Sequence, residues 1–163
     1  MTRPPKLAKR LETFLKTYAT QDGQTLSYIE KVYADKPRAD VKKADFPRIW
    51  IQDRSPSDRY GVGSEKQRYA VDITFWIYVG KDSIVVDSSG STISSPEEAI
   101  YIISTALKDF LIDNQSTLAG TYEEGVLALN GFNYDFLGED QTDFINLDVY
   151  KGFLQISDGI YIR

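Results

Sequence analysis

The sequence predicts an α+β fold, an antiparallel or mixed β-sheet with two main helices packed against it, in one domain spanning residues 1–163. Three observations support this prediction. Residues 69–79 alternate between two sets of side chains, which is typical of a β-strand. Residues 6–20 and 96–114 carry apolar side chains at the spacing of amphipathic helices, and strand-like patterns return from residue 126 onward.

The first expected element is an amphipathic helix over Lys6 to Thr20, with apolar residues on one face and charged residues on the rest of the wheel. A second apolar pattern, Leu26 to Tyr33, indicates a short helix that ends before Pro37. The charged stretch Asp35 to Asp45 has no periodicity, so we expect a connection there.

A strand is expected over Phe46 to Gln52, with Pro47 near its start, where a missing amide donor is tolerated. The next stretch, Asp53 to Arg68, is rich in Gly, Ser and charged residues, and it predicts a long exposed connection. Connections of this length in compact domains usually bind something or become ordered in an assembly.

The central strand, Tyr69 to Val79, is expected to have one face in a core and the other partly solvated or covered by another subunit. The core face would consist of Tyr69, Val71, Ile73, Phe75, Ile77 and Val79. The mixed face would consist of Ala70, Asp72, Thr74, Trp76 and Tyr78. After a turn at Gly80, Ile84 to Val86 indicates a short return strand, and Asp87 to Ser95 is expected to be a loop.

The second helix has the clearest expected boundary in the chain. Ser95 is predicted as the N-cap, Pro96 as the first helical residue and Glu98 as the acid of a capping box. The helix is expected to end near Asn114, with its apolar residues on one broad face.

Two more strands are expected, over Val126 to Tyr134 and Phe144 to Gln155, separated by an acid-rich turn at Asp135 to Asp143. Within the second strand, Gly152 indicates a bulge. The tail, Ile156 to Arg163, is expected to add a short hairpin arm.

The composition argues against several classes of site. The chain has no Cys and no His, which removes disulfides, thiolate metal sites and the Ser-His-Asp and Cys-His catalytic arrangements. A net charge of −5 argues against a protein that mainly grips nucleic acid. The sequence has no run of about 18 apolar residues, so we expect no membrane partner and a cytoplasmic or assembly location. We also expect no enzymatic activity, no cofactor and no metal.

Two motifs resemble ligand sites only superficially. Gly61 to Ser64 lacks the spacing and the Lys of a phosphate loop, and it precedes a strand instead of a helix, so a flexible loop is expected. Glu139, Asp140, Asp143 and Asp148 do not follow the order of a calcium-binding loop, so we expect solvated turn acids.

The sequence offers two candidate contact surfaces. The first is a basic and aromatic stretch that either meets an acidic partner or DNA, or is simply a solvated loop. Its candidate residues are Arg54, Arg59, Tyr60, Lys66 and Arg68. The second is the mixed face of the central strand, with Asp72, Trp76 and Tyr78. Together with Trp50, these aromatic residues are suited to an interface, and placement in a core is nearly as consistent with the pattern.

The expected elements follow the order of an amphipathic helix, a Pro-led strand at Phe46 to Ile51, a polar loop, a long alternating strand at Arg68 to Val79, a helix and closing strands. This order resembles that of the tail terminator or tail completion proteins of tailed bacterial and archaeal viruses. The resemblance implies a virion structural protein without an active site, made in the host cytoplasm. It also implies a homo-oligomeric ring, hexameric in this family, on the head-proximal end of the tail. Its partners would be the tail tube protein and the neck or connector proteins, with DNA only passing through the lumen.

Two alternatives remain open. The first is another neck or head-to-tail joining protein, or a tail-tube component. The second is a small ligand-binding module that uses Trp50, Trp76 and the tyrosines as a stacking surface. A monomer with a deep aromatic pocket would favour ligand binding, whereas a flat apolar seam would favour assembly.

Overall fold

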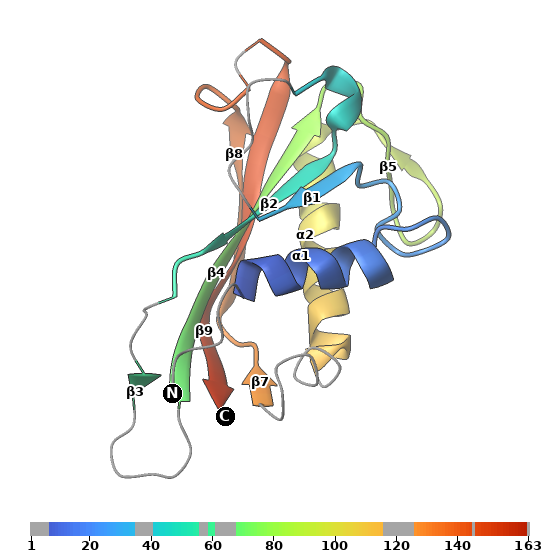
Figure 1. Cartoon of the computed structure of the whole chain (residues 1–163). Helices are drawn as coiled ribbons and strands as arrows, with labels where there is room; N and C mark the ends of the chain where they lie inside the picture. Colours follow the sequence, from blue (N-terminus) through green and yellow to red (C-terminus); the bar gives the residue numbers. More distant parts are fainter. Residues whose placement is uncertain are drawn as a thin grey trace.

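A computed structural model describes residues 7–34, 41–55, 59–60, 68–115, 126–144 and 146–162. The fold is α+β, as predicted, with two helices packed on one face of a mixed, curled β-sheet (Figure 1). Seven strands in the described part of the chain form this sheet, in the order β1-β2-β4-β9-β7, with β3 paired to β4 and β8 paired to β9.

The strands of the main sheet are β1 (Lys31–Tyr33), β2 (Arg48–Asp53), β3 (Arg59–Tyr60), β4 (Arg68–Gly80), β7 (Val126–Ala128), β8 (Phe132–Glu139) and β9 (Val149–Ile162). Two short strands, β5 (Val85–Val86) and β6 (Thr92–Ile93), pair only with each other. The 3₁₀ helix η1 covers Lys43–Asp45. Strand β1 runs parallel to β2, and the other pairs are antiparallel.

Both predicted helices are confirmed. Helix α1 spans Leu7–Tyr18 and helix α2 spans Pro96–Asp113. Helix α1 contacts β1 and β2, whereas α2 contacts β4, β8 and β9, so the two helices cover different halves of the sheet. The predicted capping box of α2 is wrong, because the side chain of Ser95 makes no capping hydrogen bond.

The central strand β4 is confirmed, and its apolar face forms the core. All six residues of that face, Tyr69, Val71, Ile73, Phe75, Ile77 and Val79, are at most 2% exposed. They pack with the apolar faces of both helices in one cluster, together with inward-facing residues of β2 and β9. The period-two pattern of this stretch therefore identified both the strand and the face that is buried.

Of two predictions around short elements, one is wrong and the other is confirmed only in part. The expected helix over Leu26 to Tyr33 is a run of turns followed by β1, which pairs with β2. Apolar residues three apart also suit a turn that leads into a short strand, so their spacing did not separate the two structures. The short return strand expected over Ile84 to Val86 is present as β5, but it pairs with β6, inside the predicted loop, and not with β4. Strand β4 already pairs with β2 and β9 on its two sides, so it has no free edge for β5.

The predicted connection at Asp53 to Arg68 contains the short strand β3, and residues 56–58 and 61–67 lie outside the described part. The charged connection expected over Asp35 to Asp45 contains η1 at its end, and residues 35–40 lie outside the described part.

The strand boundaries in the last third differ from the prediction. Gly131, with φ +73°, separates β7 from β8, and β8 continues through Glu139 into the expected acidic turn. Strand β9 begins at Val149 and runs on to Ile162, so the expected hairpin arm is its continuation along β4.

Gly152 marks a close approach of α2 instead of the predicted bulge. A Cβ atom at this position would overlap the side chain of Ile100 on α2 and would lie 2.7 Å from the carbonyl oxygen of Asp135. The irregularity in pairing lies on the neighbouring strand, between Phe136 and Gly138 of β8.

Candidate assembly surface

The sheet face opposite the helices carries rows of side chains that run across the strands. Directly opposite residues of paired strands project from the same face. Trp50 of β2 lies opposite Trp76 of β4, and Trp76 lies opposite Phe153 of β9. One flanking row consists of Gln52, Thr74 and Gln155, and the other consists of Arg48, Tyr78 and Lys151.

The aromatic row is Trp50, Trp76 and Phe153, and all three side chains are partly exposed. The two Trp rings stack at 6.4 Å between centroids, and Phe153 meets Trp76 edge-on at 5.9 Å. The Trp76 indole Nε1–H donates to Oε1 of Gln52 at 2.9 Å, and Nζ of Lys151 lies 4.5 Å from the Trp76 ring centre. Packing, a hydrogen bond and a cation therefore fix the position of Trp76 before any partner arrives.

Asp72 and Arg54, two predicted contact residues, meet where the chain leaves β2. The backbone N–H of Arg54 donates to the carbonyl oxygen of Asp72 at 2.8 Å, and the Arg54 side chain is exposed. The Asp72 carboxylate accepts a hydrogen bond from Nε2 of Gln155 at 3.3 Å, and its backbone N–H donates to Oγ of Ser55 at 2.8 Å. Asp72 therefore helps to hold the start of the predicted contact stretch against the sheet.

The rest of that basic stretch is described only in part. Arg59 and Tyr60 form β3, which pairs with Tyr69 and Arg68 of β4. The side chains of Arg59, Tyr60 and Arg68 lie outside the description, as do all of Lys66 and residues 61–64. Their predicted role in assembly stays a prediction.

Tyr78 is fully buried, so the prediction that it contributes to an exposed seam is wrong. The loop between β8 and β9 folds over this end of the face, and Phe46, Tyr78, Phe144 and Val149 form a second, smaller apolar cluster. The Tyr78 hydroxyl donates to Oδ2 of Asp143 at 2.8 Å, and Nζ of Lys151 donates to the same oxygen at 3.0 Å. Burial, followed by the interaction with Asp143, raises the pKa of Tyr78.

Arg48 lies beside this second cluster and is only 6% exposed. Its guanidinium carbon is 4.3 Å from the ring centre of Tyr33 and 5.3 Å from that of Phe144, so cation–π contacts surround the buried charge. Burial raises the pKa of Tyr33 to about 12, and the charge of Arg48 opposes that rise.

The acids near β8 and β9 take three different positions. Glu139 and Asp148 are exposed, as expected, and Asp143 is partly buried. Asp140 is 4% exposed, and the Asp143 side chain is 14% exposed and bonded to Tyr78 and Lys151, so the prediction of solvated acids is wrong for these two residues. Within the described residues, no group of three or more acidic side chains is arranged to hold a metal ion.

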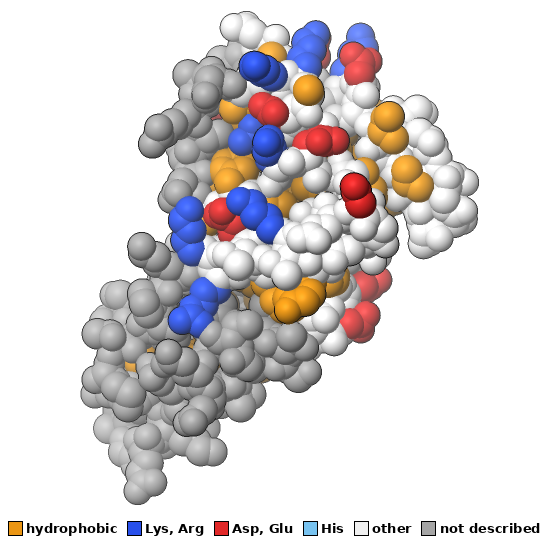
Figure 2. All heavy atoms as spheres, turned by 45° about the vertical axis from the view of Figure 1, so that its right-hand side comes forward, with side chains coloured by type: hydrophobic (Ala, Val, Ile, Leu, Met, Phe, Trp, Pro, Cys, Tyr) orange, Lys and Arg blue, Asp and Glu red, His pale blue; other side chains and the backbone are white. Residues whose placement is uncertain are grey.

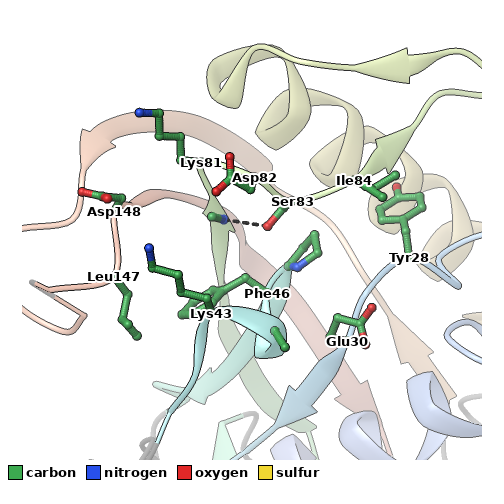
Figure 3. A pocket seen from close by; sticks show the side chains of 13 residues that line it. Tyr28, Glu30, Lys43, Phe46, Lys81, Asp82, Ser83, Ile84, Leu147 and Asp148 are labelled. Atoms are coloured by element: carbon green, nitrogen blue, oxygen red, sulfur yellow. Dashed lines mark hydrogen bonds between the residues drawn. The ribbon is translucent and has the colours of Figure 1, made fainter.

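A pocket of about 500 Å³ opens at the end of the sheet near η1 (Figure 3). Apolar residues such as Phe46, Pro47 and Ile84 line it, together with charged residues. The charged lining residues are Glu30, Lys43, Lys81, Asp82 and Asp148. Apolar surface with a charged border is the usual arrangement of a protein–protein interface. No single stretch of sequence indicates this pocket, because four separate segments of the chain build it.

No family model matches the chain, and no curated protein sequence matches it. Neither described helix has the length and apolar character needed to cross a lipid bilayer.

Proposed function

We propose that this protein is a virion structural protein, a tail terminator that forms a homo-oligomeric ring on the head-proximal end of the tail tube. The ring would stop tube growth and join the tube to the neck or connector. The observation that carries the proposal is the helix-free sheet face with its fixed aromatic row of Trp50, Trp76 and Phe153.

The aromatic row supports an assembly role in two ways. Aromatic residues are enriched in interfaces, and Trp is among the residues that contribute most to binding there. The three rings already pack on one another, and Gln52 holds Trp76, so little side-chain freedom remains to be lost on binding.

The order of the elements is the second support. Helix α1, the Pro-led strand β2, the long strand β4, helix α2 and the closing strands follow one another as in the tail terminators that the sequence resembles. A ring of six copies, as in that family, needs each copy to present more than one contact surface.

The proposal is tested by mixing the purified protein with its tail tube protein and imaging the tubes by negative stain. We expect tubes of limited length with a ring at one end. Trp76→Ala should reduce capping, whereas Tyr18→Ala should not, because Tyr18 is 55% exposed on α1, away from the aromatic row. A protein that stays monomeric at high concentration and never caps tubes would contradict the proposal. Binding to connector proteins without any binding to tubes would favour another neck protein.

A second candidate function is a ligand-binding module. The observation that favours it is the stacked pair Trp50 and Trp76, with the amide groups of Gln52 and Gln155 in the neighbouring row. Saturable quenching of Trp fluorescence by a planar ligand, lost in Trp76→Ala, would support this function. Failure of a panel of such ligands to quench would argue against it.

A further inference from the structure

Charge is divided unevenly along the chain. Residues 1–81 contain sixteen Lys and Arg residues and ten Asp and Glu residues. Residues 82–163 contain only three Lys and Arg residues and fourteen Asp and Glu residues. No Lys or Arg occurs between Lys108 and Lys151, a stretch that includes all of β8. Strands β1 and β8 lie toward opposite edges of the sheet (Figure 1), so the charged residues that the structure describes near each of them can be compared.

The half of the molecule at β8 is acidic. Helix α2 covers this half, and residues 96–115 and 126–144 together carry eight acids and one Lys. Strand β8 pairs with β9 on one side, and no described strand pairs with its other side. Tyr134 and Leu137 on β8 are 41% and 51% exposed, and Asp135 and Glu139 are exposed beside them. The carboxylate of Glu139 makes no ion pair within the described part of the chain.

The half of the molecule at β1 is basic. Helix α1 covers this half, and residues 7–18, 30–34 and 41–45 together carry six Lys and Arg against three acids. Lys31 and Lys43 are exposed and make no ion pair with any described residue. Figure 2 brings this side forward and shows Lys and Arg side chains spread from the top of the molecule down to α1, with acids among them. The pocket beside η1 adds apolar surface to this edge.

The strand register places the two charged edges at the same level of the sheet. Gly138 of β8 pairs with Lys151, Lys151 with Tyr78, Tyr78 with Arg48, and Arg48 with Lys31. One row of paired residues thus crosses the whole sheet. Its acidic end is Gly138, which lies between Leu137 and Glu139, and its basic end is Lys31. A rotation about an axis along the strands would bring these two ends together.

We propose that copies of this chain join head to tail, with the β8 edge of one copy docked on the β1 and η1 edge of the next. This inference rests on the proposed ring and names its subunit contact. Two different, complementary surfaces on one chain are what a closed ring requires, whereas a two-fold dimer needs a single self-complementary patch. Glu139 and Asp135 face Lys31 and Lys43, and Tyr134 and Leu137 cover the apolar part of the pocket.

The test reverses the charge of each edge in turn. The variant D135K/E139K has two basic edges, and K31E/K43E has two acidic edges. Each alone should fail to form the ring, with a dissociation constant raised at least about 100-fold, because like charges across an interface are strongly unfavourable. An equimolar mixture should form rings in which the two variants alternate. The control D22K/D113K makes the same change in net charge as D135K/E139K, at exposed positions in the turn after α1 and at the end of α2, and should form rings as the unmodified chain does.

Sedimentation velocity measures each sample, and circular dichroism checks that each variant is folded. Rings formed by either reversed variant alone would overturn the edge contact and leave the ring proposal standing. A mixture of folded variants that stays monomeric would overturn the edge contact as well. An unmodified chain that is monomeric under all conditions would overturn the ring itself and the contact with it.

Discussion

Asp140 holds the loop between β8 and β9 against the sheet. Its carboxylate accepts hydrogen bonds from the backbone N–H groups of Asp143 at 3.2 Å and Phe144 at 2.6 Å. These bonds fix Phe144 over the ring of Tyr78, where the two rings meet edge-on at 4.9 Å. The sequence could not predict this role, because an acid in an acid-rich turn is usually solvated and the burial arises only when the loop folds back on β4.

Replacing Asp140 should therefore destabilise the protein. Asp140→Ala leaves the buried N–H of Phe144 and the partly buried N–H of Asp143 without their acceptor, and we expect the free energy of unfolding to fall by about 2–3 kcal/mol. Urea denaturation measures this change, and Asp158→Ala on the exposed end of β9 is the control. A loss no larger than that of the control would contradict the role assigned to Asp140.

Glu12 connects α1 to the end of β1 and makes stability depend on pH. Its carboxylate accepts hydrogen bonds from Lys16 Nζ at 2.8 Å and from the backbone N–H of Ala34 at 2.7 Å. Burial raises the pKa of Glu12, but these bonds and the charges of Lys16 and Lys9 outweigh it, so the pKa lies below its ordinary value of 4.5. A lowered pKa in the folded state stabilises the protein above the unfolded-state pKa, and this contribution disappears as the pH falls through the folded-state pKa.

Glu12→Gln should consequently lower the melting temperature at pH 7, and the difference from the unmodified chain should shrink as the pH falls below about 4. Thermal melts between neutral and acidic pH measure this, with Glu98→Gln on the exposed start of α2 as the control. A difference that stays constant down to pH 3 would show that the Glu12 charge does not contribute to stability.

At the scale of elements, long patterns predicted structure more completely than short ones did. The alternation of β4 and the apolar face of α2 each extend over many residues, and both elements were predicted nearly to their ends. Strands β1 and β6 have three and two residues, and their existence depends on the partners β2 and β5. The side-chain pattern of two or three residues does not indicate which strand, distant in the sequence, they will pair with.

Gly152 makes the contact between α2 and the sheet possible. In Gly152→Ala the new Cβ would overlap Ile100 and would lie 2.7 Å from the carbonyl oxygen of Asp135. We expect a loss of about 1–3 kcal/mol in the free energy of unfolding, the usual range for overpacking a core.

Chemical denaturation of Gly152→Ala measures this loss, and the double variant with Ile100→Ala should show strong coupling, because the first substitution clashes with the side chain that the second removes. Gly90→Ala is the control, since its Cβ would have no atom within 4 Å and only its φ of +87° is unfavourable. Additive effects of the two core substitutions would contradict the proposed clash.

At the scale of the whole molecule, the sequence located part of the candidate surface. Trp76 and Asp72 lie on the helix-free face, as the alternation of β4 predicted. Phe153 and Lys151 join them through the register between β4 and β9, and Tyr78 is covered by a loop from elsewhere in the chain. Neither the register between distant strands nor the path of that loop can be predicted from a single segment of the sequence.

Assembly into a ring is the central claim, and the mass of the native protein in solution tests it. Native mass spectrometry of the purified chain at micromolar concentration should show a dominant species of about six times the single-chain mass of 18.5 kDa. Rising ionic strength should shift this species toward single chains, since charge holds the proposed contact together. A single species at 18.5 kDa, unchanged by concentration and by salt, would contradict the ring.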